Sequence, residues 1–465
     1  MTNKILLRVG LAFLMAGSAH SAMAQAAGPV SMADAIAVAL NSNPEIAQAQ
    51  YNTEAIQEER RQAEGLYAPR INLEGSAGIR ELDNTTRRSL GIATQTLYPL
   101  EAIGRAEWTA IDFGRRRGEL LRQSARVDGA SMRVLERSEF IALQVARQYL
   151  DVLLQQRIYA ASEDNVSFHR SLVNDLGTGV SQGSISIADQ QQAQERLQAA
   201  LVRQSEAEQA MENAKISLRR LTGLDVDQVQ VPPELTANMP ASESEAIGLA
   251  RTENPRVKEA AADVDAATAL AQSAHGDLFP TIGVELTGRI GQDIDGFRGE
   301  TRDAQARAVV RWNIFDGGIN RAKYQEMVRR ASEARYKLYT VTREAEEDVR
   351  SAMNALRMQG RISTDLGTES RVSDDLLLSY RSQFNVGRRS LLDVLDAQNS
   401  RYSVQTRLET ARFSELFARY QTLAATNRLL SSLNLAPGVG AGMHERDNHN
   451  YGPPAPAELQ YRTRP

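Results

Sequence analysis

Cysteine is absent from the sequence, and histidine and aromatic residues are scarce. The lack of cysteine excludes a disulfide framework, a thiolate metal site, a cysteine nucleophile and an acylated lipoprotein cysteine. The histidines are too scattered for a zinc-binding helix or a triad of sequence neighbours; they are His20, His169, His275, His444 and His449. We therefore expect no enzyme active site, no metal and no cofactor.

An excess of charge and a long apolar run are also missing. The 54 Lys and Arg residues nearly balance the 58 Asp and Glu residues, so no nucleic-acid partner is predicted. No apolar run reaches the ~20 residues of a membrane-spanning helix. Lys4 and Arg8 precede an apolar stretch, which is followed by a small-x-small site at Ala22–Ala24. This pattern predicts a signal peptide over residues 1–24 and export from the cytoplasm.

Proline is absent from residues 100–231 and 281–436, which permits helices far longer than usual. Apolar residues recur there at spacings of three and four, as in the seams of a coiled coil. Such helices would be roughly 90 Å long at the rise of an α-helix. In the first repeat we predict an outgoing helix over Arg115 to about Leu176, a turn at Gly177–Gly183, and a returning helix over about Ile185–Leu221. In the second repeat we predict an outgoing helix over Ile319 to about Phe384, a turn at Asn385–Gly387, and a returning helix over about Leu391–Leu433.

The chain contains an internal duplication. Pro69 is repeated 211 residues later at Pro280, while Trp108 and Asp112 are repeated 204 residues later at Trp312 and Asp316. Matches in this order predict two tandem copies of one structural unit. We assign the first repeat to residues 25–231, a connection to 232–245, the second repeat to 246–435, and a Gly- and Pro-rich tail, expected to be disordered, to 436–465.

Two alternating segments in each repeat predict β-strands. Apolar and polar residues alternate over 71–80 and 282–290, and again over 102–108 and 304–312 before each tryptophan. Strands of about ten residues with unlike faces suit a transmembrane β-barrel that has polar residues toward its lumen. Four strands per chain do not close a wide barrel, so several chains would contribute. A soluble, half-buried sheet is the alternative. The surface loops would be Glu81–Glu101 and Gly291–Asp303.

Two acidic residues follow the turn of the second repeat, at the start of its predicted returning helix. Asp393 and Asp396 are three residues apart and share a helix face. The first repeat has Asp189 at the position of Asp393, but Gln192 at that of Asp396. Taken alone, acids of this kind are typical of a solvated surface.

Two segments of the second repeat resemble the TolC family of outer-membrane channels. They are residues 312–318, Trp-Asn-Ile-Phe-Asp-Gly-Gly, and residues 384–398, which include Asp393 and Asp396. The resemblance extends from about Ser31 to Leu435. It implies a homotrimer in the outer membrane that reaches into the periplasm. Its fold would be an all-α tunnel plus a transmembrane β-barrel, with four strands from each chain forming a barrel of twelve and four long helices from each chain forming a tunnel of twelve.

The resemblance also implies a gate at the far end of the tunnel. Asp189 of the first-repeat turn would bond Arg389 of the second, while Asp393 and Asp396 would form rings that select cations. Phe384 occupies the position of a gate tyrosine and lacks its hydroxyl. We further expect Trp108 and Trp312 to lie at the membrane interface with lipid.

Two alternatives for the cargo stay open within this family. The double arginine and double leucine of residues 388–392, and the lack of a lipoprotein cysteine, are more similar to the type I secretion branch than to the drug-efflux branch. Both branches imply a periplasmic adaptor and an inner-membrane transporter as partners. A periplasmic coiled-coil scaffold or adaptor is the alternative of another class.

Overall fold

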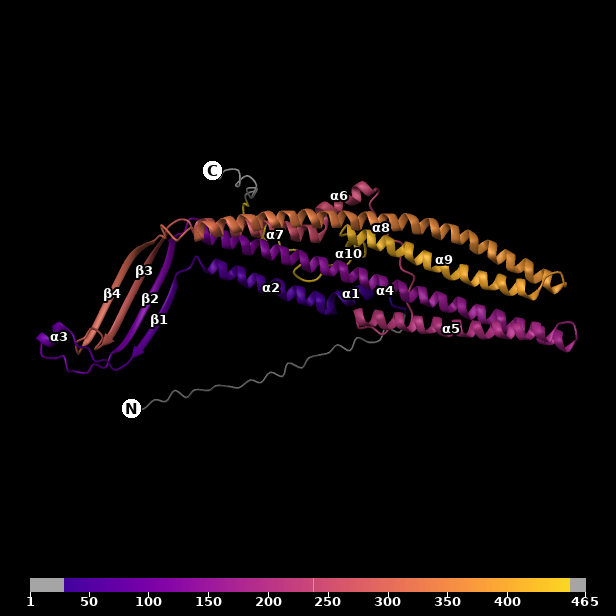
Figure 1. Ribbon diagram of the computed structural model, residues 1–465, viewed down its shortest axis with the longest axis horizontal. Coiled ribbons are helices and arrows are strands. Elements are labelled where there is room, and N and C mark those ends of the chain that lie inside the picture. Colours follow the sequence, from indigo (N-terminus) through magenta and orange to yellow (C-terminus); the bar gives the residue numbers. More distant parts are fainter. Residues whose placement is uncertain (1–28, 237, 452–465) are drawn as a thin grey trace, which may run out of the picture.

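The computed structural model describes residues 29–236 and 238–451 as an elongated molecule, with a small sheet at one end and long helices running away from it (Figure 1). The expected signal peptide lies outside these residues. In the part of the chain that is described, no helix combines the length and the apolar character needed to cross a bilayer.

The two repeats have the same order of elements, apart from the short helix α3 (Thr85–Ser89) between the strands of the first. The first contains α1 (Met32–Ser42), α2 (Pro44–Gly65), β1 (Arg70–Ala77), α3 (Thr85–Ser89), β2 (Leu100–Ile111), α4 (Arg115–Ser181) and α5 (Ile187–Thr222). The second contains α6 (Glu243–Glu253), α7 (Pro255–Gly276), β3 (Thr281–Gln292), β4 (Glu300–Arg311), α8 (Ile319–Asn385) and α9 (Leu391–Ala425). Two short helices follow, α10 (Leu429–Ser432) and the 3-10 helix η1 (Glu445–Asn448).

The duplicated Asn-Pro pairs begin two equivalent helices. The side chain of Asn43 accepts a hydrogen bond from the backbone nitrogen of Glu45 at 2.9 Å, which caps α2. Asn254 caps α7 in the same way through Arg256, at 3.0 Å. In both cases proline takes the first helical position, where its missing N–H costs no hydrogen bond. The sequence repeat therefore specifies the same local start twice.

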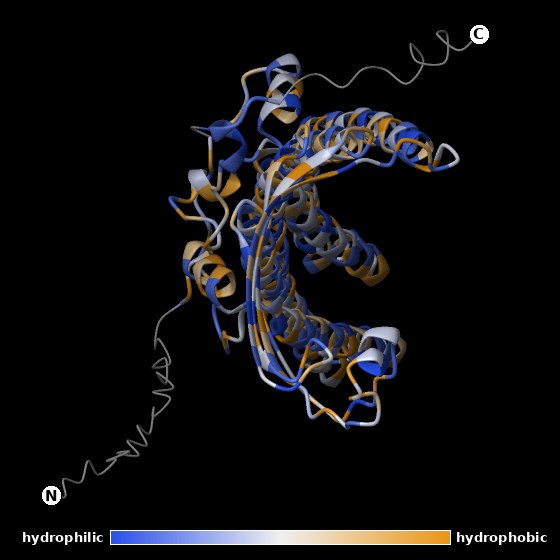
Figure 2. Ribbon diagram, turned by 90° about the vertical axis from the view of Figure 1, so that its left-hand side faces the viewer, coloured by the Kyte–Doolittle hydropathy of each residue, from blue (hydrophilic) through white to orange (hydrophobic). Residues whose placement is uncertain are grey.

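The four strands form one antiparallel sheet in the order β1-β2-β3-β4, which curves when seen along the molecule (Figure 2). Ile71 lies opposite Ala106 in the β1–β2 pair, and their duplicates Ile282 and Val310 lie opposite each other in the β3–β4 pair. The two strand pairs therefore have the same register. The two repeats meet at the β2–β3 pair.

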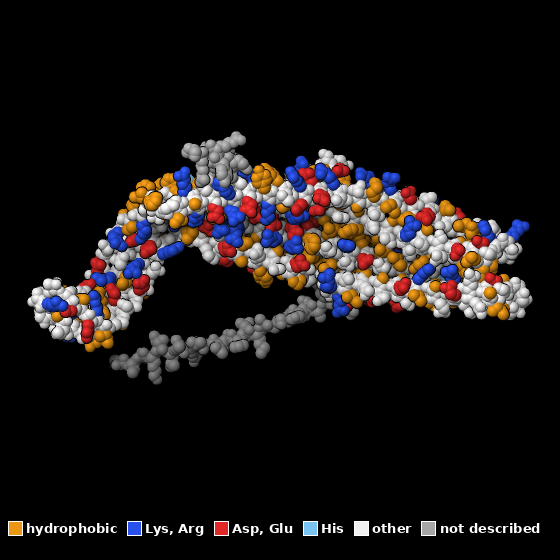
Figure 3. All heavy atoms as spheres, viewed as in Figure 1, with side chains coloured by type: hydrophobic (Ala, Val, Ile, Leu, Met, Phe, Trp, Pro, Cys, Tyr) orange, Lys and Arg blue, Asp and Glu red, His pale blue; other side chains and the backbone are white. Residues whose placement is uncertain are grey.

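The long helices form two hairpins, α4 with α5 and α8 with α9 (Figure 1). The largest apolar core lies part-way along them, where α1 and α10 also pack. Its fully buried side chains include Ile36, Val145, Tyr149, Leu218 and Tyr420. On the visible surface of the helical part, acidic and basic side chains are interspersed (Figure 3).

Several boundaries differ from those expected from the sequence. The segment predicted as a turn from Gly177 is helical to Ser181, and Gly179 allows the returning chain to pack closely, because an added Cβ would lie 2.6 Å from Ile185 Cγ1. The predicted helix from Leu391 to Leu433 ends at Ala425, since Asn427 has a left-handed φ of 57°. The first loop contains α3, and β3 and β4 extend into both ends of the second loop.

The prediction of a disordered tail is wrong for residues 436–451. The backbone nitrogen of Gly438 donates to Ser138 Oγ at 3.0 Å, and that of Glu445 donates to Asp128 Oδ1 at 2.6 Å, so the segment is bound along α4. Glycine serves close packing here, because an added Cβ at Gly438 would lie 2.8 Å from Ile46 Cγ2. Composition alone suggested disorder because it does not reveal these side-chain acceptors on α4. Residues 452–465 lie outside the described part.

Candidate functional site: the paired helical turns

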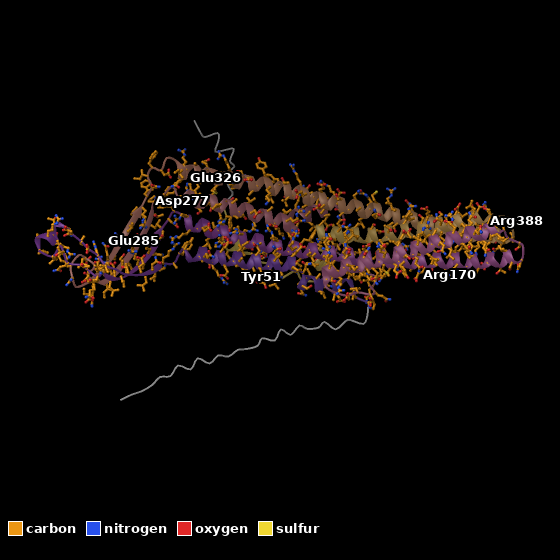
Figure 4. All side chains as sticks on the ribbon, turned by 60° about the horizontal axis from the view of Figure 1, so that its bottom comes forward. Tyr51, Arg170, Asp277, Glu285, Glu326 and Arg388 are labelled. Carbon is orange, nitrogen blue, oxygen red and sulfur yellow. The ribbon has the colours of Figure 1, made fainter. Side chains whose placement is uncertain are left out.

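Both hairpin turns lie at the end of the molecule farthest from the sheet (Figure 1). Each turn has a glycine with positive φ, Gly183 at 73° and Gly387 at 72°, which non-glycine residues adopt only with strain. A serine then caps the returning helix. Figure 4 shows Arg388 at this end and Glu285 in the sheet at the other. The sequence-predicted gate residues therefore come together at one tip.

The acidic residues Asp189 and Asp393 have equivalent local roles in the two turns. Ser186 Oγ donates to Asp189 Oδ2 at 2.7 Å, and the Asp189 backbone nitrogen donates to Ser186 Oγ at 3.1 Å. Ser390 and Asp393 make the corresponding bonds at 2.8 Å and 3.2 Å, and together form a capping box. Both carboxylates therefore stabilise the start of a helix.

Arg389 is placed by contacts within its own hairpin. Its Nη1 lies 3.7 Å from Asp393 Oδ2, and its guanidinium lies 4.2 Å from the centre of the Tyr380 ring. Among the residues described here, no ion pair joins Arg389 to Asp189. The expected pair is thus not formed within a single chain, and it stays a prediction for an assembly of several chains.

Asp396 differs from Asp393 in its surroundings. Its side chain is exposed on the first turns of α9 and accepts no hydrogen bond from the part of the chain that is described. An exposed carboxylate without a local partner keeps its charge available to passing ions. Asp396 is thus free of local bonds, whereas Asp393 is held in a cap, and the expected cation-selective rings stay a prediction.

Phe384 is half-buried and belongs to the apolar contact between the hairpins. It packs against a cluster formed by Leu172 and Leu176 of α4 with Leu391 and Leu395 of α9. A phenylalanine fits this position because the surroundings are apolar and require no hydroxyl partner. Its effect on gating stays a prediction.

A buried polar contact behind the turns was missed by sequence reasoning. Gln398 Nε2 of α9 donates to Asn165 Oδ1 of α4 at 2.8 Å. His169 lies one turn further along α4, and its burial, followed by the nearby Arg203 and Arg196, lowers the pKa of its imidazole to about 4. Gln398 was one of the residues repeated between the two copies, which was the available signal. The bond between Gln398 and Asn165 joins the two hairpins.

The two tryptophans make duplicated contacts at the other end. Trp108 Nε1 donates to the carbonyl of Tyr67 at 3.0 Å, and Trp312 Nε1 donates to the carbonyl of Leu278 at 3.4 Å. Leu278 is the duplicate of Tyr67, 211 residues later. Both indoles are exposed where the sheet meets the helices. Their location at a lipid interface stays a prediction.

The polar face of the sheet carries ion pairs. Arg105 Nη1 donates to both carboxylate oxygens of Glu74 at 3.0 Å. Glu285, the duplicate of Glu74, accepts from Arg307 at 2.9 Å and also from Arg311. Strand register gathers these charges on one face and leaves the other mainly apolar, except near the β3–β4 loop, where Gln292, Glu300 and Arg302 lie. In residues 29–236 and 238–451, no three His, Asp or Glu side chains are arranged to hold a metal ion.

The sequence pattern of the family described as "Outer membrane efflux protein" matches residues 35–224 and 246–435. The chain belongs to this family. Both matched segments correspond to the two structural repeats described above. The outer membrane efflux family places the protein in the outer membrane with an extension into the periplasm, and its members are channels rather than enzymes.

Named relatives confirm the resemblance to the TolC family. The outer membrane efflux protein BepC of Brucella suis is 25% identical over 288 residues, which cover 62% of this chain and 63% of BepC. TolC of Vibrio cholerae is 23% identical, with 78% of this chain and 82% of TolC covered. The alkaline protease secretion protein AprF of Pseudomonas aeruginosa is 21% identical, with 62% of this chain and 61% of AprF covered. The chain thus spans less than two thirds of BepC and AprF.

A solved structure confirms the fold. The CmeC outer membrane channel of Campylobacter jejuni superimposes with a TM-score of 0.77 over 90% of this chain and 88% of CmeC, although only 13% of residues are identical. The TolC-like combination of a small antiparallel sheet and long helical hairpins was therefore predicted correctly from the sequence.

Proposed function

We propose that the protein is the outer-membrane exit channel of a type I protein secretion system. Three copies form a homotrimer in which the sheets build one barrel through lipid and the helical hairpins build a periplasmic tunnel. The tunnel tip docks with a periplasmic adaptor and an inner-membrane transporter, which supplies the energy. The channel itself opens and closes a path and catalyses no reaction.

The observation that carries this proposal is the continuity between a two-faced sheet and two long hairpins. α4 and α8 each contain 67 residues, roughly 100 Å of helix, and both begin within a few residues of a strand. All four strands turn most of their polar side chains to one face, which suits a water-filled lumen. One chain therefore supplies a section of pore wall from lipid to the tunnel tip.

Secretion is favoured over drug efflux by the second turn. Residues 388–392 read Arg-Arg-Ser-Leu-Leu, which is similar to the secretion branch, and AprF is named for the secretion of a protease. BepC and the family description support the second candidate, the outer-membrane component of a drug or small-molecule efflux pump. The two candidates differ in cargo and share the same architecture.

Gene deletion separates the two candidates. We expect the deletion strain to lose one or a few large proteins from its culture medium while its susceptibility to drugs and dyes is unchanged. Complementation with the wild-type gene serves as the control. An unchanged secretome together with greater drug susceptibility would favour the efflux pump. A protein recovered only as a water-soluble monomer would contradict both.

A further inference from the structure

A cavity lies at the joint where α7 begins and α9 ends. Asn254, the cap of α7, donates from Nδ2 to the carbonyl of Ala425, the last residue of α9, at 3.2 Å, which holds the two helix ends together. The cavity beside this bond has a volume of about 300 Å³, near the lower limit for pockets that hold small ligands. Residues of α4 and α8 complete its wall.

The wall of this cavity combines apolar surface with a few charged groups. Its apolar residues come from α4, α7 and α9, and are Phe140, Leu143, Pro255, Ala424 and Ala425. Its acids are Glu136 and Glu139 of α4 and Asp348 of α8, against a single base, Arg256 of α7. Apolar walls with a small number of polar groups are typical of sites for small organic molecules.

Of the three acids in the wall, only Glu139 lacks a basic partner. Arg137 Nε donates to Glu136 Oε2 at 2.6 Å, and Arg256 Nη1 donates to Asp348 Oδ2 at 3.2 Å. Glu139 is 6% exposed, and no ion pair within the described residues compensates its charge. Its Oε1 accepts from a backbone nitrogen at 3.3 Å, whereas Oε2 has no partner among these residues. A buried carboxylate oxygen without a partner is costly.

Neither the local structure nor the duplication requires an acid at residue 139. Oε1 alone makes the contact with Leu430 of α10, and the carbonyl oxygen of a glutamine could make the same contact. The corresponding position of the second repeat, 204 residues later, is Arg343, which is exposed. The buried acid is therefore a feature of the first repeat alone, and the duplication supplies no second copy of this cavity wall.

We propose that this cavity binds a small organic cation, whose ammonium head donates to Glu139 Oε2 and whose short aliphatic chain lies against Phe140 and Leu143. An ammonium group supplies both the positive charge and the donors that the buried carboxylate lacks. A metal ion fits less well, because the described part of the chain contains no group of three acidic or histidine side chains that could coordinate one. The site goes beyond the proposed channel function and does not depend on it.

A proton competes with this ligand for Glu139. Burial raises the pKa of Glu139 to about 8. The charged groups that share the cavity wall are Glu136 from the same helix, Arg256 from α7 and Asp348 from α8, while α9 adds the neutral Gln421. An alkylammonium keeps its proton in this range, as lysine does. Binding should therefore displace a proton from Glu139, and the affinity should rise by up to about tenfold per pH unit below pH 8.

Isothermal titration calorimetry of the full-length protein in lipid nanodiscs tests the site with n-butylamine. We expect saturable binding of one ligand per chain at pH 8, with a Kd of ~1 mM or tighter, which is reasonable for about five non-hydrogen atoms. Titrations in buffers with different heats of ionisation should show the release of a proton. The control ligand n-butanol has a similar shape but no charge, so it should bind at least about tenfold more weakly.

Three variants locate the ligand. Glu139→Gln keeps the acceptor for α10 and removes the charge, so it should weaken the binding of n-butylamine by at least about tenfold and abolish proton release. Ala424→Leu should also block binding, because the longer side chain fills part of the cavity. Glu119→Gln is the matched control on α4, since Glu119 is paired with Arg122 outside this wall and should bind as the wild type does.

Equal binding of n-butylamine and n-butanol would show an apolar void without an ion pair. Equal binding by the wild type and Glu139→Gln would locate the ligand elsewhere. Either result would overturn the proposal, and so would the absence of saturable binding by the wild type at pH 8.

Discussion

The guanidinium of Arg389 lies 4.2 Å from the centre of the Tyr380 ring, across the turn that joins α8 to α9. The same group lies 3.7 Å from Asp393, so it links the last turns of one helix to the first turn of the next. The position of Arg389 in the first repeat is occupied by Ile185, which has no charge. The second hairpin therefore has an ionic contact that the first lacks, and the two turns are unequal.

Replacing Arg389 with serine is expected to loosen the tip. Arg389→Ser removes the cation–π contact, worth about 0.5–1 kcal/mol at an exposed site, and the ion pair with Asp393. We expect a higher single-channel conductance in planar bilayers. Arg388→Ser is the matched control, because the exposed Arg388 side chain makes no ion pair or ring contact with the described residues. Equal conductance of the wild type and Arg389→Ser would exclude this role.

Removing the two acids of the second turn is expected to reduce cation selectivity. The double variant Asp393→Ala with Asp396→Ala should move the reversal potential in a salt gradient toward zero, because fewer negative charges face passing ions. Asp393 also caps α9, so the loss of the cap must be separated from the loss of charge. Ser390→Ala weakens the cap by about 0.5–2 kcal/mol and keeps both acids. Selectivity that falls equally in Ser390→Ala would contradict the charge explanation.

Sequence reasoning predicted the parts of the fold that repeat a local pattern. Alternation located the strands, and the absence of proline together with apolar residues at spacings of three and four located α4 and α8. The tail from 436 to 451 was missed because its Gly and Pro content resembles disorder, whereas its order depends on acceptors such as Asp128 more than 300 residues away. The Gln398–Asn165 contact was not predicted for the same reason, because the two residues are 233 positions apart in the sequence. Contacts between distant segments leave little trace in one sequence.

Glu139 is expected to make stability depend on pH. Its carboxylate is buried in α4, where Oε1 accepts from the Leu430 backbone nitrogen at 3.3 Å and Oε2 has no partner among the described residues. It lines a cavity of about 300 Å³ together with Glu136 and Asp348. Burial raises the pKa of Glu139 to about 8, so at pH 7 the folded chain keeps a proton that the unfolded chain has released.

The direction in which pH changes the stability follows from the raised pKa of Glu139 in the folded state. Between pH ~4.5 and 8 the folded state binds more protons at Glu139, so stability falls as pH rises, by at most about 1.4 kcal/mol per pH unit. The pKa of His169, lowered by burial to about 4, has the opposite effect, because its contribution is lost as pH falls from ~6.5 toward 4. The two partly cancel near and below pH 6.5. Across the window from pH 6.5 to 8 the contribution of His169 fades and that of Glu139 dominates.

Thermal unfolding in this window tests the role of Glu139. The melting temperature of the wild type should fall from pH 6.5 to 8, while that of Glu139→Gln, which mimics the protonated form, should stay level. Glu136→Gln is the control, since Glu136 is paired with Arg137 near the surface. A wild type with a level profile, or an equal slope in both variants, would show that Glu139 is already ionised in the folded protein.

Gly118 is expected to be necessary for the contact between α4 and α7. A Cβ added there would lie 2.5 Å from the backbone nitrogen of Ser273 and 2.8 Å from the carbonyl of Ala269, so α7 must move away. Gly118→Ala should lower the free energy of unfolding by about 1–3 kcal/mol, less the gain of up to ~1 kcal/mol from alanine in a helix.

Gly129→Ala on the same helix separates the steric clash with α7 from the gain in helix propensity. An added Cβ there would lie 3.5 Å from Ala262 Cβ and 4.0 Å from the carbonyl oxygen of Glu259, both ordinary contacts. The gain in helix propensity should therefore dominate, and the variant should match or exceed the wild type in stability. Urea unfolding followed by circular dichroism measures both. Equal stability of the two variants would mean that α7 can move away from residue 118 with little loss of stability. The second repeat has Ala322 at the position of Gly118. Within the chain α8 packs against α7 of its own repeat, whereas α4 packs against α7 of the other repeat, so Gly118 lies where the two repeats meet.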